Sequence, residues 1–523
     1  MEFRAFFKTS SLWEKIFGAG VLIYLGFCFF SFWHFQYLPF RDWYDWVLEG
    51  QILAHLSQPE FNSYYQPVKY PVPNSFASFF LGLFSRFLCP EQAGRLWLCI
   101  SFLVFILGFW YCARWLVGGN SWGYLGLFLV WNHWFLIGNL NQHFGFGIFL
   151  LALARICFKK PERFSWKLVW ELNFWGMFLF FIHFTVYFAF LIFLFFWFWE
   201  RERKILQSGF QVIFGTGISL IFLFWYLLKS LSGENTGRLF FWYHPFYHFY
   251  GWLYTLLPFA SGGLESSLPQ GFAWLNLFYL LLLHLLIFLG AGFFLFKFYS
   301  QAGREEKILL WTAGGFFLIL VLAPFQLGKC NGFNFRFGFL FILTFLISVS
   351  REYQRYFKRL TQFISLGIAF VILGAFFSQA KKMQVPLSQL EQFLKSNISS
   401  GERAFYFIFY QPLEAGGKRK LVKYYYPQTG IIAHLYYSGG CYPNKFETGL
   451  ILKTEKCPTY PASNLETKPV RFFKEQLDNL ARDFDSIILV GRIKTTSRFI
   501  SLVAEKFSPK KKSELALYLE KKK

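Results

Sequence analysis

The stretch PFRDWYDWVLEG, residues 39–50, places three carboxylates directly after the first long apolar run of the chain. Asp42 and Asp45 are the only aspartates before Asp478, so they are not routine solvating charge. Pro39 suits the first turn of a helix, where its missing N–H costs nothing. A helix that begins there puts Asp42, Asp45 and Glu49 on one face, at positions i, i+3 and i+7.

The composition identifies a membrane protein. The chain has 523 residues, of which 55% are hydrophobic, 24% aromatic and only 15% charged, and its mean hydropathy is +0.36. Apolar runs of about 20 residues recur, which is the length an α-helix needs to cross the hydrocarbon layer. The first run, about 16–35, is too long for a cleaved signal peptide and has no small-residue cleavage site.

The net charge of +23 is assigned to topology and not to nucleic-acid binding, because Lys and Arg cluster in short loops between apolar runs. Placing these clusters in the cytoplasm predicts about 11 transmembrane helices, with the N-terminus inside and the C-terminus outside. Two spans lie between Arg114 and Arg155 and turn near 138–145, and two more turn near His183. Further spans are predicted at 208–230, 273–298, 306–325, 333–350 and 360–378.

Residues 71–88, PVPNSFASFFLGLFSRFL, are apolar but short, and we predict a helix that lies in or re-enters the outer leaflet. If this segment spanned fully, every later assignment would invert and the basic loops would face outward. The positive-inside rule, by which Lys and Arg gather in cytoplasmic loops, disfavours that arrangement.

In this predicted topology the outer loop 36–94 carries Asp42, Asp45 and Glu49. We predict that its first helix rests in the membrane interface, with Trp43 and Trp46 toward lipid and the acids toward a cavity. The alternative is a purely solvated acidic face, the role we expect for Glu49. Further along, NSYYQPVKYPVPNSF (62–76) forms a stiff, proline-rich segment in which Lys69 offers a point charge for a phosphate. Alternatively, Lys69 snorkels to a lipid headgroup.

This order of segments resembles the GT-C superfamily of membrane glycosyltransferases, which take a sugar from a polyprenyl-phosphate carrier on the outer side of the membrane. The resemblance extends to NQHFGFGIFLLALAR (141–155), FFIHFTVYFAF (180–190) and NGFNFRFGFLFILTF (331–345), and it covers most of residues 15–378. Many members carry an acid in the second polar motif of the family, which corresponds to the first of these segments, where this chain has Asn141, Gln142 and His143.

The resemblance implies an inverting glycosyltransferase with Asp42 as general base and Asp45 as a helper that carries like charge or binds acceptor or metal. The cationic candidates for the donor phosphate are Lys69, Arg336 and His143. The remaining substrate-binding candidates are Tyr64, Tyr65, Tyr70, Asn141 and Gln142. No cofactor is required, and a divalent metal is optional. The acceptor is a lipid, a glycan or a protein.

Residues 1–379 are predicted to form the transmembrane catalytic domain, and residues 380–523 an extracytoplasmic α/β domain. RAFYFIFY (403–410) and SIILVG (486–491) are typical of buried strands, and 472–484 of an amphipathic helix. This domain carries a net charge of about +12, which favours anionic lipids or an anionic acceptor, with a disordered lysine tail as the plainer interpretation. Cys441 and Cys457 can pair if it lies outside the cell.

Two other classes of function fit the same composition. A transporter or lipid flippase also has many spans and intramembrane histidines, here His183 and His284, but it predicts internal repeats that the sequence does not show. A non-catalytic scaffold of GT-C type is the third possibility. The preferred location is a bacterial inner membrane, where such enzymes serve cell-envelope glycan synthesis.

Overall fold

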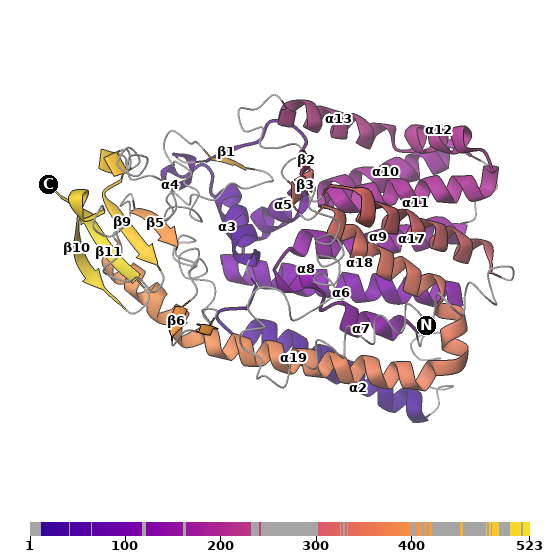
Figure 1. Cartoon of the computed structure of the whole chain (residues 1–523), viewed down its shortest axis with the longest axis horizontal. Helices are drawn as coiled ribbons and strands as arrows, with labels where there is room; N and C mark the ends of the chain where they lie inside the picture. The colour runs from indigo at the N-terminus through magenta and orange to yellow at the C-terminus, as the bar shows by residue number, and fades with distance from the viewer. Residues whose placement is uncertain are drawn as a thin grey trace.

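The computed structural model describes residues 12–40, 42–63, 65–117, 122–159, 164–231, 240–241, 302–324, 326–327, 330–331, 333–398, 404–408, 413–415, 418–420, 450–452, 477–478, 481–482, 484–490, 503–513 and 516–522. Within these residues, helices form a layered bundle and a small sheet lies at one end, at the left of Figure 1. Cys441, Cys457 and His284 fall outside the described residues.

The bundle is built from long apolar helices. These are α2 (Leu12–His34), α6 (Pro90–Val117), α9 (Leu140–Lys159), α10 (Trp166–Ile182), α11 (Phe184–Glu202), α17 (Arg304–Leu322), α18 (Phe333–Ser348) and α19 (Ser350–Asn397). By length and composition, five described helices can cross a membrane, or six if one bent pair counts as a span. A multi-pass helical membrane protein is therefore confirmed. The total of 11 spans stays a prediction, because the span at 273–298 lies outside the described residues.

Two predicted spans are broken. The span after 208 consists of α12 (Ile205–Gly215) and α13 (Gly217–Leu231), which meet at an angle of 79°. The first span of the pair between Arg114 and Arg155 is a series of short pieces: η1 (Trp122–Leu125), α7 (Gly126–Leu129) and α8 (His133–Leu136). By contrast, α10 and α11 turn at His183 as predicted.

The segment 71–88 contains α5 (Ser75–Phe84), a helix of 10 residues. Such a helix rises about 15 Å, roughly half the hydrocarbon thickness. It is therefore too short to span, in agreement with the prediction for this segment.

Contrary to the sequence prediction, helix α3 (Trp43–Ala54) does not turn Trp43 toward lipid. It begins at Trp43, four residues after Pro39, and packs against α5 and α6. Trp43 and Val47 are fully buried, and the Trp43 indole donates a hydrogen bond to the Gly94 carbonyl at 3.1 Å. The prediction was wrong because the face with apolar side chains meets protein, and an amphipathic pattern fits a protein partner as well as lipid.

Residue 379, the predicted domain boundary, lies inside α19, which continues to Asn397. This helix of 48 residues is about 72 Å long, far more than a bilayer requires. Its C-terminal half is tied to the start of the first loop, since Gln384 accepts the backbone N–H groups of Gln36 and Tyr37 at 2.9 and 3.1 Å. The Tyr37 hydroxyl donates to Glu391. The change in composition at 379 therefore falls within a continuous helix.

The C-terminal sheet has the order β10-β11-β9-β5. Its strands are β5 (Ala404–Ile408), β9 (Ser486–Val490), β10 (Phe507–Lys512) and β11 (Ala516–Lys521). The pair β5–β9 is parallel and the others are antiparallel. Both predicted strands are present. The expected disordered lysine tail is instead the β10–β11 hairpin, in which Lys510 pairs with Glu520 at 2.7 Å.

Short strands join distant parts of the chain. β1 (Tyr65–Pro67), which follows α4 (Pro59–Asn62), pairs antiparallel with β8 (Leu450–Leu452). The loop that carries Lys69 and the C-terminal region therefore lie on the same side of the bundle, as the predicted topology requires. The other described strands are β2 (Phe240–Phe241), β3 (Gln326–Leu327), β4 (Cys330–Asn331), β6 (Leu413–Ala415) and β7 (Lys418–Lys420).

Helices α6 and α9 approach each other closely at Gly147, and this gives a first testable prediction. A Cβ atom on Gly147 would lie 2.6 Å from the Val104 carbonyl oxygen, and backbone cannot move aside as a side chain can. We expect Gly147→Ala to lower the free energy of unfolding by about 1–3 kcal/mol, measured as thermal unfolding of the purified protein. Gly26→Ala on α2 is the control, because a Cβ there meets nothing within 4 Å. Equal stability of the two variants would contradict the prediction.

Candidate functional site

Asp42 is fixed to the turn between α8 and α9. It occupies the N-cap of α3, and its backbone N–H donates to the Ile137 carbonyl at 2.7 Å. Gly138 allows this approach: its φ is +88°, and a Cβ there would lie 2.5 Å from the Trp43 nitrogen. The start of the acidic helix and the α8–α9 turn therefore form one unit.

The three acids of the opening stretch have different surroundings. Asp42 and Asp45 are half-buried, whereas Glu49 is only 1% exposed. The expectation that Glu49 faces solvent was wrong, because α5 and α6 cover the helix beyond its first turn. Asp42 and Asp45 are thus the acids that remain accessible to a ligand.

Arg336 reaches the same turn from α18. Its guanidinium lies 5.0 Å from the centre of the Trp134 ring on α8, and it donates a hydrogen bond to His183 Nε2 at 2.6 Å. The structure therefore brings Asp42 and Arg336 to one turn. Trp134 and His183 were not among the predicted site residues. The sequence could have indicated His183, because it lies at a predicted helix break. It could not have indicated Trp134, because nothing in the sequence distinguishes this residue from the many other aromatic residues.

Asn141 organises the site and offers no free polar atom. It is fully buried, its Nδ2 donates to the Asn74 carbonyl at 2.5 Å, and its Oδ1 accepts the Ala77 N–H at 3.2 Å. Asn74 has a left-handed φ of 70°, and its Oδ1 accepts the Phe184 N–H at 3.1 Å. These bonds join α5, α9 and α11, so we assign Asn141 a positioning role.

His143 is also fully buried. One ring nitrogen lies 3.0 Å from the Ser101 hydroxyl and the other 3.1 Å from the Val130 carbonyl. The ring stacks on Phe105. Both nitrogens are therefore engaged within the protein, and we do not retain His143 as a phosphate ligand.

The candidates from the first loop lie on the β1–α5 segment. Lys69 is exposed, Tyr70 is half-buried, and Tyr65 is 2% exposed, where it pairs with Leu452 in the β1–β8 ladder. Tyr64 lies outside the described residues. Lys69 is five residues from Asn74, so the length of the chain allows the two residues to lie up to about 18 Å apart. The structure does not join Lys69 to Arg336 through a described contact.

A metal ligand set is not assembled in the described part of the chain, where no three His, Cys, Asp or Glu side chains are grouped. The carboxylates of Asp42 and Asp45 and the amide oxygens of the α8–α9 turn are ligand types that suit Mg²⁺ or Ca²⁺.

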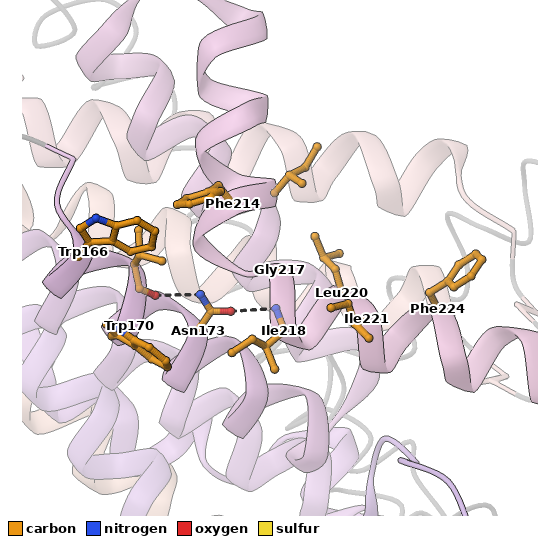
Figure 2. A pocket seen from close by; sticks show the side chains of 11 residues that line it. Trp166, Trp170, Asn173, Phe214, Gly217, Ile218, Leu220, Ile221 and Phe224 are labelled. Carbon is orange, nitrogen blue, oxygen red and sulfur yellow. Dashed lines mark hydrogen bonds between the residues drawn. The ribbon is translucent and has the colours of Figure 1, made fainter.

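A separate groove of about 760 Å³ opens between α10, α12 and α13. Its lining is apolar apart from Asn173, whose amide accepts the Ile218 N–H at 3.0 Å and donates to the Val169 carbonyl, as Figure 2 shows. It contains no acid or base, whereas Asp42 and the Arg336 guanidinium both meet the α8–α9 turn. The Asn173 side chain stabilises the bend between α12 and α13.

No protein family and no curated protein matches this sequence. Among solved structures, the chain aligns with "ArnT from Cupriavidus metallidurans bound to Undecaprenyl phosphate", with a TM-score of 0.53 and 13% sequence identity over 97% of both chains. The apo structure of that protein aligns at 12% identity, with a TM-score of 0.49 and the same coverage. The first likeness establishes the fold, which is the GT-C fold that the sequence predicted.

The contact between the α8–α9 turn and α3 generates the second prediction. We expect Gly138→Ala to separate the two, because alanine tolerates neither the positive φ nor the short distance to Trp43. Hydrogen exchange at the Asp42 amide should accelerate by at least about ten-fold as its bond to Ile137 is lost. Gly209→Ala on α12, where a Cβ meets nothing within 4 Å, should leave that rate unchanged. Full protection in the Gly138 variant would refute this account.

Proposed function

We propose that this protein transfers a sugar from a polyprenyl-phosphate donor to a lipid, glycan or protein acceptor, with Asp42 as general base. The observation that carries the proposal is the assembly of Asp42 and Arg336 at one turn within a GT-C fold. The neighbouring structure, ArnT, is bound to undecaprenyl phosphate, and this supports a donor of the same lipid class.

Asp42 and Arg336 contact different parts of the α8–α9 turn, which supports a single displacement with the base and the leaving phosphate on different sides of the sugar. Asp42 touches one part of the α8–α9 turn, and Arg336 stacks on Trp134 in another part. In the proposed reaction the acceptor hydroxyl loses its proton to the Asp42 carboxylate as its oxygen bonds to the anomeric carbon. The bond from that carbon to the phosphate oxygen breaks, and polyprenyl phosphate leaves with the electron pair. Attack opposite the leaving group inverts the anomeric carbon.

Arg336 supplies the cation for the leaving phosphate. A planar guanidinium binds two phosphate oxygens at once, and stacking on Trp134 with a bond to His183 holds it in one orientation. Lys69, which is exposed on the β1–α5 segment, adds a second point charge when a donor is bound. Asp45 lies one turn from Asp42 and binds the acceptor.

The remaining assignments follow from the predicted topology. The site faces the extracytoplasmic side of a bacterial inner membrane, the N-terminus is cytoplasmic, and the basic C-terminal domain attracts an anionic acceptor or anionic lipids. The reaction needs no organic cofactor, and a divalent metal is optional.

Removal of the base tests the proposal directly. In membranes supplied with polyprenyl-phosphate sugars, we expect Asp42→Asn to reduce sugar transfer by about 10²–10⁴-fold, the usual contribution of a general base. Asp45→Asn should have a smaller effect on turnover and a larger one on the KM for the acceptor.

The control is Glu49→Gln, which alters a buried acid away from the proposed reaction and should change stability more than the turnover of folded protein. Undiminished glycan product in Asp42→Asn membranes would rule out this mechanism. Transport of a lipid or solute without sugar transfer would favour a transporter instead.

The leaving-group role of Arg336 gives a separate prediction. Arg336→Lys keeps the charge but loses the planar fork and most of the stacking on Trp134. We expect the KM for the donor to rise by roughly ten-fold or more, the cost of one charged hydrogen bond, with little change in the KM for the acceptor. An equal change in both constants would indicate general disruption of the site.

A further inference from the structure

Three buried polar atoms without a hydrogen-bond partner gather at the α8–α9 turn. They are Trp134 Nε1, Gln142 Nε2 and Asn139 Oδ1. Trp134 is 5% exposed and Gln142 fully buried. The residues are linked, since the Asn139 N–H donates to the Trp134 carbonyl at 2.9 Å and its Nδ2 to Gln142 Oε1 at 3.2 Å. Buried polar atoms are rarely left unpaired, so a cluster of three requires an explanation.

Two residues shortly before the cluster, Trp131 and Asn132, have partners for their side-chain polar atoms. Asn132 accepts the Phe135 N–H at 3.1 Å and donates to the carbonyls of Leu129 and Val130. The Trp131 indole donates to the Tyr24 hydroxyl at 2.5 Å. The three unpaired atoms of the cluster therefore follow two satisfied side chains and lie where the chain turns toward Asp42 and Arg336.

The position of the cluster matches that of a donor sugar. Arg336 covers one face of Trp134, so a phosphate on Arg336 holds its attached group beside that indole. The Asp42 N–H is bonded to the carbonyl of Ile137, which stands between Trp134 and Gln142 in the sequence. A sugar between the leaving phosphate and the base must therefore pass along this turn. This step rests on the proposed function.

The unpaired atoms also specify the chemistry of the sugar. Two are N–H donors and one is an amide oxygen, and all three are uncharged. A hydroxyl group both donates and accepts, so adjacent hydroxyls can satisfy all three atoms. A buried ammonium or carboxylate substituent facing these three atoms would find no opposite charge among them. We propose that Trp134, Asn139 and Gln142 form the sugar-recognition site and that it selects a neutral, hydroxyl-bearing sugar.

Binding tests this without catalysis. The purified full-length protein in nanodiscs is titrated with undecaprenyl phosphate alone and with the same lipid carrying glucose, galactose, mannose, arabinose, glucosamine or glucuronic acid. Each hydrogen bond gained contributes about two- to ten-fold in affinity. We expect at least one neutral sugar to bind roughly ten-fold tighter than the bare lipid and tighter than either charged sugar.

Gln142→Met removes the amide at similar volume, and Trp134→Phe removes the indole N–H but also alters the ring beneath Arg336. Each should lose most of the affinity due to the sugar. Binding of bare undecaprenyl phosphate should stay within about two-fold of wild type in Gln142→Met, because the described side-chain hydrogen bond of Gln142 joins it to Asn139 and not to Arg336. Trp97→Phe is the matched control, because its indole N–H is also buried and unpaired but lies among phenylalanine rings.

The outcomes separate the two proposals. If wild type binds none of these lipids, the proposed function fails. If it binds the bare lipid but gains nothing from any neutral sugar, or prefers a charged one, the recognition site is refuted and the function is not. An equal loss in the Trp97 variant would also overturn the assignment of this cluster.

Discussion

The structure depends on one constraint of the bilayer, which is that a backbone N–H in hydrocarbon must have a partner. A continuous helix meets this requirement internally, but this bundle is interrupted several times. At three interruptions an asparagine side chain accepts an N–H from the first turn of the next helix: Asn132 from Phe135, Asn74 from Phe184 and Asn173 from Ile218, at 3.0–3.1 Å. Breaks that would otherwise be unfavourable are thereby stabilised, and the candidate site is assembled at two of them.

The general architecture was predictable because hydrocarbon imposes a length and a composition on each span. The breaks were not, because the chain stays apolar through them. Asparagines within apolar runs, such as Asn132 and Asn173, were the available signal. The position of α3 was missed for a different reason: a helix with one apolar face fits lipid and protein equally well, and only the contacts with α5 and α6 decide between them.

For the candidate site, the sequence revealed the charged residues but not the residues that contact and position them. Asp42 and Arg336 stand out because charge is scarce beside apolar helices. Trp134, His183 and Asn74 do not, since their roles arise from contacts between segments far apart in the chain, such as the bond that joins residues 74 and 184. His143 shows the opposite case, a polar residue in a suggestive motif that is occupied by packing and hydrogen bonds to Ser101 and Val130.

The pairing of β1 with β8 links the loop that carries Lys69 to the C-terminal region. A strand at the edge of a sheet presents unpaired N–H and C=O groups to any chain of suitable shape. In a chain shortened after α19, residues 65–67 would lose their strand partner and expose that edge beside the membrane. The pairing with β8 therefore covers one edge of β1 and removes a place where another chain could add a strand.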